Sequence, residues 1–240
     1  MFIRSLICLL LFACSSANRT PCRAQDADVL GEIERFDPRF DALVPPEARI
    51  ELLASGFQWS EGPVWVPRDG VPGDGGFLLF SDVRTNSIMK WTAGEGVSVF
   101  LKPSGYTGAA EYGTQPGSNG LLLDSEGRLV CCEHGDRRIS VMTWDGGKVT
   151  LADRYQTKRF NSPNDAVYHS SGALYFTDPP YGLPERENDP HREIDFCGVY
   201  RLAPDGQVTL VTDEMTKPNG IALSPDEKTL YVAQSDGAAP

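Results

Sequence analysis

Residues 159–182, RFNSPNDAVYHSSGALYFTDPPYG, contain a short pattern that recurs along the chain. The pair Asn164 and Asp165 precedes an apolar run, a Ser-Ser-Gly turn and a second apolar run that ends at Thr-Asp-Pro-Pro. Two apolar runs joined by a tight turn are typical of a β-hairpin. The segment therefore predicts a hairpin whose first strand begins at an uncharged amide, although the strand itself has the composition of core.

Three other segments share this order of a polar residue, a small residue, an apolar run, a turn and a second apolar run. The four segments begin at Glu61, Asn119, Asn164 and Asn219. After each of the first three come two further strand-like runs, joined by GEG, DGG and PDG turns respectively. Repeated four-stranded meanders without helices between them are typical of β-propeller blades. The sequence therefore predicts an all-β propeller with about three and a half blades.

The repeat also predicts where the polar residues lie. The first strand of a propeller blade lines the central channel, so Glu61, Asn119, Asn164 and Asn219 should converge on one face of the axis. Counting strand reversals places the ends of the second strands on that face. The residues found there are Asp82, Glu133, His134, Asp178, Ser235 and Asp236. The insertion 179–196 and the Gly-rich segment 103–118 are expected at the rim.

One carboxylate and several amides facing a channel suit a hard divalent cation such as Ca²⁺ or Mg²⁺, because these ions take oxygen ligands. An amide supplies an acceptor without adding repulsion between like charges. The set contains none of the thiolates or imidazoles that favour zinc. The sequence therefore predicts a cation site that stays open to water and ligand.

At these same positions the chain resembles the senescence marker protein / gluconolactonase / luciferin-regenerating enzyme family. The matching stretches are SEGPVW at 60–65, RFNSPNDAV at 159–167, YFTDPPYG at 175–182 and KPNGIALSPDEKTLYVAQSD at 217–236. The resemblance implies a six-bladed propeller with one divalent metal in its channel. It also implies hydrolysis of a sugar lactone, in which metal-activated water attacks the lactone carbonyl.

By position, the resemblance assigns Glu61, Asn164 and Asn219 as metal ligands and Asn119 as a substrate or water contact. Ca²⁺ is the expected metal, with Mg²⁺, Mn²⁺ or Zn²⁺ as alternatives. The family's general-base aspartate is expected beyond Pro240, so no catalytic residue is assigned.

His134 and Asp178 are candidate substrate-binding residues because of the face on which they are expected. Asp165 and Asp178 are the nearby carboxylates that could act as a base. Simpler interpretations stay open. Asp178 could cap a turn, and Asn-Gly at 119–120 and 219–220 is also a common hairpin turn.

Two other functions are compatible with the same residues. One is a non-catalytic propeller that binds a partner and keeps its metal for stability. The other is a paraoxonase-like esterase or phosphotriesterase. Four tryptophans, Trp59, Trp65, Trp91 and Trp144, are interpreted as packing within the blades.

The N-terminal segment has a different character. Residues 1–25 combine a basic start, a short apolar stretch and a polar tail, which is the pattern of an export signal. Cleavage before Cys14 would give a lipoprotein, and cleavage after Ala24 a soluble protein, so the protein is expected to be periplasmic, secreted or lipid-anchored.

The rest of the chain is divided into two parts. Residues 26–47 are interpreted as a linker and 48–240 as a partial propeller lactonase domain. The run ARIELLASG at 48–56 is the expected strand that completes the last blade, and the ring is expected to be cut short at its C-terminus.

The net charge of the chain limits the classes of molecule that it is expected to bind. The formal net charge is -11, which repels nucleic acids and anionic membranes. The expected partner is a small lactone, with no membrane contact except a lipid on Cys14. Cys131, Cys132 and Cys197 are expected to be buried thiols, because vicinal cysteines in a strand point to opposite faces and cannot readily bridge.

Overall fold

The computed structural model describes residues 28–67 and 75–237. The chain divides into two compact units, with the boundary in the sequence between Leu53 and Ala54. The first unit contains β1 (Asp28–Val29), the 3₁₀ helix η1 (Pro38–Ala42) and β2 (Glu51–Leu52). The predicted export signal lies outside the described residues. Within the described residues, no helix has the length and apolar character needed to cross a membrane.

The described residues of the first unit make hydrogen bonds with one another. Arg35 donates to the carbonyl oxygens of Val44 and Pro45 at 2.7 Å each. Within the run 48–56, the structure shows β2, which pairs antiparallel with β1. The role of the run 48–56 in completing the last blade stays a prediction.

The second unit confirms the all-β prediction. Its described residues form three four-stranded antiparallel meanders, a two-stranded sheet and a small β-ribbon. The first meander consists of β3 (Ser60–Pro67), β4 (Gly76–Asp82), β5 (Ser87–Thr92) and β6 (Gly96–Leu101). The second consists of β7 (Ser118–Leu123), β8 (Leu129–Glu133), β9 (Arg138–Met142) and β10 (Lys148–Ala152). The third consists of β13 (Ala166–Tyr168), β14 (Leu174–Asp178), β15 (Gly198–Leu202) and β16 (Val208–Thr212).

The remaining elements of this unit are short. β17 (Pro218–Leu223) pairs with β18 (Leu230–Gln234), and β11 (Arg154–Tyr155) pairs with β12 (Lys158–Arg159). Two 3₁₀ helices, η2 (Val83–Thr85) and η3 (Arg186–Asn188), lie in connecting loops.

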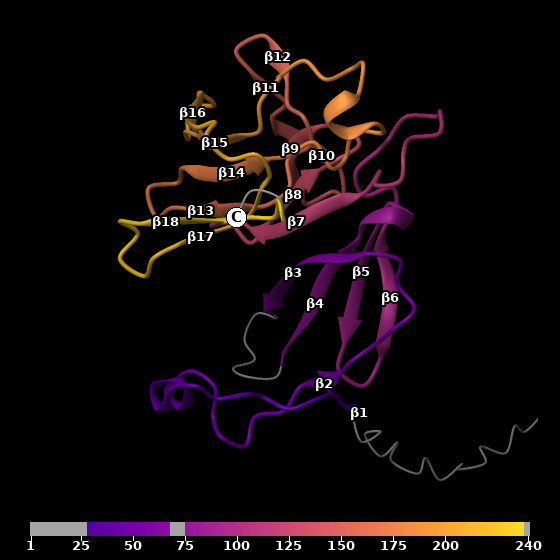
Figure 1. The fold of residues 1–240 in the computed structure, drawn as a ribbon. Helices are drawn as coiled ribbons and strands as arrows, with labels where there is room; N and C mark the ends of the chain where they lie inside the picture. Colours follow the sequence, from indigo (N-terminus) through magenta and orange to yellow (C-terminus); the bar gives the residue numbers. More distant parts are fainter. Residues whose placement is uncertain (1–27, 68–74, 238–240) are drawn as a thin grey trace, which may run out of the picture. The chain divides into compact units, whose positions relative to one another are not determined.

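The first strands of successive sheets are neighbours. β7 contacts both β3 and β13, and β13 contacts β17. Figure 1 shows β7, β13 and β17 close together. The polar residues that open these strands are thereby brought together.

Two apolar cores join the sheets. One joins the first and second meanders and includes Leu79, Ile88 and Cys131. The other joins the second and third meanders and includes Cys132, with a cluster of aromatic rings at its centre. The rings of Phe160, Phe176 and Tyr200 have centroids 5.1 to 5.4 Å apart.

The cysteines behave as predicted. Cys131 and Cys132 are fully buried and point into different cores, and Cys197 is also free and buried. Burial raises the pKa of the Cys131 thiol to about 12, because the thiolate would lose its hydration. These thiols are therefore inert apolar residues at neutral pH.

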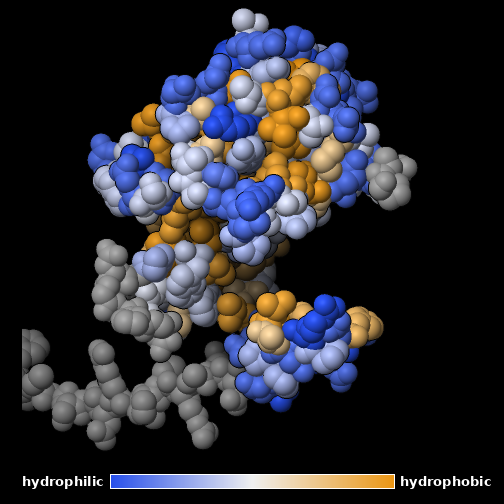
Figure 2. Space-filling view, turned by 90° about the vertical axis from the view of Figure 1, so that its left-hand side faces the viewer, coloured by the Kyte–Doolittle hydropathy of each residue, from blue (hydrophilic) through white to orange (hydrophobic). Residues whose placement is uncertain are grey.

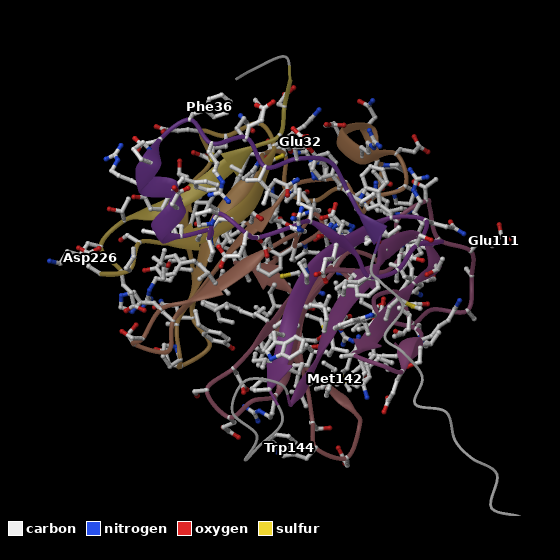
Figure 3. All side chains as sticks on the ribbon, turned by 90° about the horizontal axis from the view of Figure 1, so that it is seen from below. Glu32, Phe36, Glu111, Met142, Trp144 and Asp226 are labelled. Atoms are coloured by element: carbon white, nitrogen blue, oxygen red, sulfur yellow. The ribbon has the colours of Figure 1, made fainter. Side chains whose placement is uncertain are left out.

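Part of the surface is apolar. Figure 2 shows apolar residues, in orange, at the surface between polar ones. A cavity of about 210 Å³ between the first two meanders is lined mainly by apolar side chains, including Met142 and Trp144, which are labelled in Figure 3. Trp144 is 75 % exposed and Trp65 is 48 % exposed. The interpretation of Trp144 as blade packing is therefore wrong, since most of this residue faces solvent. The ring of Trp65 packs against Gly76 of β4 within the first meander, as that interpretation expects.

Candidate active site

The four polar residues that open the repeats meet at one place. Glu61, Asn119, Asn164 and Asn219 all line a cavity of about 310 Å³ and also a second cavity of about 280 Å³. Because the same side chains line both cavities, they form the boundary between them. This convergence was predicted from the sequence, whereas the roles of the residues as ligands stay predictions.

The two cavities differ in their other walls. The cavity of about 310 Å³ is called the outer cavity, because residues of the connecting loops also line it, and the cavity of about 280 Å³ is called the inner cavity. The further lining residues of the outer cavity are Trp59, Arg84, Gln115, Tyr181, Arg186 and Ser235. The inner cavity is bounded by residues further along the first strands. These are Gly62, Pro63, Leu121, Asp165 and Gly220. The insertion 179–196 and the segment 103–118 thus reach the outer cavity, as expected for a rim.

Glycine after the polar residue allows the first strands to approach closely. A Cβ atom on Gly62 would lie 2.1 Å from the carbonyl oxygen of Asn119. A Cβ atom on Gly120 would lie 2.7 Å from the carbonyl oxygen of Asn164, which accepts a hydrogen bond from the Gly120 N–H. Backbone therefore packs on backbone at these junctions, and the polar side chains converge as a result.

The Asn-Gly pairs are not turns. Residues 119–120 lie inside β7, and residues 219–220 lie inside β17. The carbonyl oxygens of Asn119 and Asn219 accept hydrogen bonds from Ser81 and Thr177, at 2.8 and 2.7 Å. The hairpin-turn alternative is therefore wrong, because both pairs belong to extended strands held by the preceding sheet.

The Glu61 carboxylate is held through one oxygen. The indole Nε1–H of Trp59 donates to Glu61 Oε1 at 2.8 Å. No hydrogen bond or ion pair among residues 28–67 and 75–237 involves Oε2. One carboxylate oxygen is therefore available to the cavities that Glu61 lines.

The side-chain amides of Asn164 and Asn219 are oriented in a similar way. Asn219 Nδ2 donates to Ser235 Oγ at 3.3 Å, and Asn164 Nδ2 lies 3.4 Å from His134 Nε2. Neither Oδ1 atom has a hydrogen-bond partner within the described part of the chain. Each amide thus has its carbonyl oxygen, the atom that ligates hard cations, free of protein partners.

Asn119 differs from the other amides. Its side chain is only 5 % exposed, lines both cavities and has no hydrogen-bond partner of its own among the described residues. A buried amide normally has partners. This amide is therefore suited to bind a ligand or water in the cavity.

These donors fit a divalent cation of the hard type. They are one carboxylate and two amide oxygens on the walls of one cavity, which is the chemistry that Ca²⁺ and Mg²⁺ prefer. The described residues contain no group of three or more His, Cys, Asp or Glu side chains placed to hold a metal. A site with one charged ligand is expected to bind weakly, since affinity rises with the number of charged ligands.

Asp165 takes the place that glycine has in the other segments. Its Oδ2 accepts from the N–H of Ile221 on β17 at 3.1 Å, and its Oδ1 accepts from the N–H of Ala166 at 2.9 Å. Burial raises the pKa of Asp165, and the negative charge of Glu61 adds to this shift. The carboxylate therefore connects two first strands while also lining the inner cavity.

Comparison with known proteins agrees with this geometry. Residues 59–239 match the family model described as SMP-30/Gluconolactonase/LRE-like region. The chain belongs to this family. It is 45 % identical over 218 residues to a gluconolactonase from Zymomonas mobilis, covering 90 % of this chain and 60 % of that protein. The chain therefore spans less than two thirds of that relative's length.

Solved structures agree with the fold. A gluconolactonase from Xanthomonas campestris superposes with a TM-score of 0.69 and 34 % identity, covering 89 % of this chain and 68 % of that one. This similarity confirms the predicted propeller fold class for this family member. Regucalcin from Agrobacterium tumefaciens, a calcium-binding protein, has a TM-score of 0.50 at 19 % identity, covering 75 % of this chain and 52 % of that one. That second similarity shows the fold alone.

The structure does not bring Asp178 or His134 to the cavity walls of this family member. Asp178 is fully buried, and its two oxygens accept from the N–H groups of Asn161 and Ser162 at 2.8 Å each. The Asp178 carboxylate therefore stabilises the loop before Asn164, which agrees with the interpretation that Asp178 caps a turn. His134 is also fully buried, and burial lowers its pKa to about 3, so its ring is neutral and lies behind Asn164.

Asp178→Asn is expected to cost less stability at pH 7 than at pH 5. Burial raises the pKa of Asp178 to about 7 in the folded protein, whereas an unfolded aspartate titrates near about 4. The folded protein thus keeps a proton that the unfolded chain releases, so the wild-type protein loses stability as the pH rises. Asparagine does not titrate, so the stability of the variant has no such dependence on pH. The free energy of unfolding lost in Asp178→Asn should therefore be smaller at pH 7 than at pH 5 by on the order of 2 kcal/mol.

Urea unfolding of both proteins at the two pH values measures this difference. The comparison between variants cancels the contribution of the other titrating groups. A penalty that grows with pH would instead show that the two backbone N–H groups keep Asp178 ionised.

Several cavity residues were missed from the sequence. Trp59 is 46 % exposed and lines the outer cavity, so its interpretation as blade packing is wrong. Its position two residues before Glu61 is a signal, because residues i and i+2 of an extended chain share a face. Tyr181 contacts Ser235 through their hydroxyl groups at 2.5 Å. Ser235 was predicted on this face and Tyr181 belongs to the insertion predicted at the rim, but no signal in the sequence pairs the two residues.

Proposed function

We propose that the protein is a lactonase that opens a sugar lactone such as gluconolactone to its hydroxy acid. The observation that carries this proposal is the cavity lined by one carboxylate and three amides from four separate strand starts. The naming of a relative with 45 % identity as gluconolactonase supports the same substrate class.

Glu61, Asn164 and Asn219 would hold the divalent cation, with Ca²⁺ the expected ion. When bound, such a cation would polarise the lactone carbonyl and offset the negative charge that develops during attack by water. The side chains that face the cavities are placed to perform the remaining tasks.

Asn119 is assigned to the substrate. Its amide is buried at the boundary of both cavities and lacks protein partners among the described residues, so a lactone hydroxyl or ring oxygen can supply them. A site built to hydrogen-bond a substrate discriminates strongly against analogues without those groups. Asn119 should therefore favour hydroxylated lactones over plain aliphatic ones.

Asp165 is assigned to the proton of the attacking water. It lines the inner cavity together with Glu61, which is assigned to the cation. Both Asp165 oxygens accept one backbone N–H, and each keeps a lone pair for a proton. Asp178 is less suitable for this role because it is fully buried behind the wall. The proton would pass from water to Asp165 as the new C–O bond to the carbonyl carbon forms. Asp165 would then return it to the ring oxygen as the ring C–O bond breaks, which gives the hydroxy acid.

The test is a rate measurement with gluconolactone. Protein supplied with Ca²⁺, Mg²⁺, Mn²⁺ or Zn²⁺ should open the lactone faster than the spontaneous rate, and a chelator should remove the excess rate reversibly. Protein treated with chelator and then given back each ion in turn is the control for loss of folded protein. Cation binding without any excess rate would favour the non-catalytic binding propeller.

A further inference from the structure

The indole of Trp59 is fixed although it is half exposed. Its Nε1–H donates to Glu61, and the guanidinium carbon of Arg84 lies 5.0 Å from the centroid of its ring. Its backbone is held as well, because the Trp59 N–H donates to Asp82 Oδ1 at 2.9 Å and its carbonyl oxygen accepts from Val83. An aromatic side chain that is 46 % exposed is not explained by burial alone.

The chemistry of the indole suits a role beside a cation ligand. Indole Nε1–H is a hydrogen-bond donor only, so it cannot itself ligate a cation. By occupying Glu61 Oε1, it leaves Oε2 as the carboxylate oxygen without a partner among the described residues. Without this bond, a partly exposed glutamate would keep several rotamers and would lose their entropy on binding.

We propose that Trp59 is a positioning residue, which orients the Glu61 carboxylate so that one oxygen is presented to the cavity. The proposal rests on the cation site of the proposed function. Arg84 contributes by holding the ring through a cation–π contact. Replacing a residue that hydrogen-bonds to a metal ligand typically lowers the affinity for the metal by about 10- to 100-fold.

Two substitutions separate the N–H group from the ring. Trp59→Phe keeps an aromatic face for Arg84 but removes the donor, whereas Trp59→Ala removes both. The matched control is Trp144→Phe, because Trp144 is exposed and lines the separate apolar cavity (Figure 3). Thermal unfolding in the presence of chelator should be the same for wild type, Trp59→Phe and Trp144→Phe, which shows that folding is intact.

Calorimetric titration of Ca²⁺ and Mn²⁺ measures the effect without an activity assay. We expect affinity to fall about 10-fold in Trp59→Phe and equally in Trp59→Ala, with no change in Trp144→Phe. Trp59→Phe should regain most of its kcat once cation is raised to saturation. Near-wild-type affinity in Trp59→Phe, with loss in Trp59→Ala only, would overturn the proposal, because the ring and not the donor would then matter.

A second readout locates the cation. Terbium bound beside Glu61 should be excited through Trp59. The excitation wavelength is chosen so that tyrosine does not absorb, because Tyr181 lines the same cavity. The sensitised emission should then persist in Trp144→Phe and be lost in Trp59→Phe at saturating terbium. Emission that survives in Trp59→Phe would also overturn the proposal. If the wild-type protein binds no cation, the cation site of the proposed function fails first. If it binds cation but opens no lactone, only the proposed activity fails.

Discussion

Glu61→Gln is expected to lower kcat/KM for gluconolactone opening by about 100-fold or more. Glutamine keeps the size of the side chain and an oxygen that can accept from Trp59, but it removes the only charged donor of the proposed ligand set. Since cation affinity depends on the number of charged ligands, the variant should bind cation far more weakly than the wild-type protein.

The measurement is a progress curve of lactone opening at fixed cation, repeated as the cation concentration is raised. Glu95→Gln is the matched control, because Glu95 lies exposed in the turn between β5 and β6. Asn219→Ala should give a loss of the same kind through a different ligand. Unchanged turnover in both Glu61→Gln and Asn219→Ala would reject the assignment of the site.

Gly62→Ala is expected to destabilise the protein by about 3 kcal/mol. Gly62 has a φ of +53°, where a side chain is strained, and its Cβ would also meet the backbone of Asn119 and Gly120 at 2.1 to 2.9 Å. Backbone atoms cannot move aside as a flexible side chain can. The first strands of two sheets must therefore separate, which also moves Glu61 away from Asn119.

Gly94→Ala is the matched control for this substitution. Gly94 has a φ of +78°, but a Cβ atom there would meet nothing within 4 Å. Gly94→Ala should lower the free energy of unfolding by only about 1 kcal/mol, because backbone strain is its sole cost. Urea unfolding of both variants measures the difference, and the Gly62 variant should also lose lactone-opening activity. Equal penalties in the two variants would show that the close approach of the first strands is not rigid.

Most of the fold could be predicted from the repeated segments in the sequence. Strand alternation and turn dipeptides are local signals, and they were sufficient to predict the sheets that the structure shows between Ser60 and Gln234. The short β2 is the exception. An apolar run at 48–56 has the composition of a strand, but whether it pairs depends on a distant partner, which turned out to be β1.

The sequence by itself determined that Glu61, Asn119, Asn164 and Asn219 share one environment, because a repeated position in a repeated unit must recur at the same place around an axis. Tertiary structure alone decided which atoms of that environment are free. The bond from Trp59 to Glu61 and the burial of Asp178 depend on distances between side chains, which no spacing along the chain encodes. The recurrence of a polar residue is a property of the chain, whereas its availability to a ligand depends on the neighbours that folding supplies.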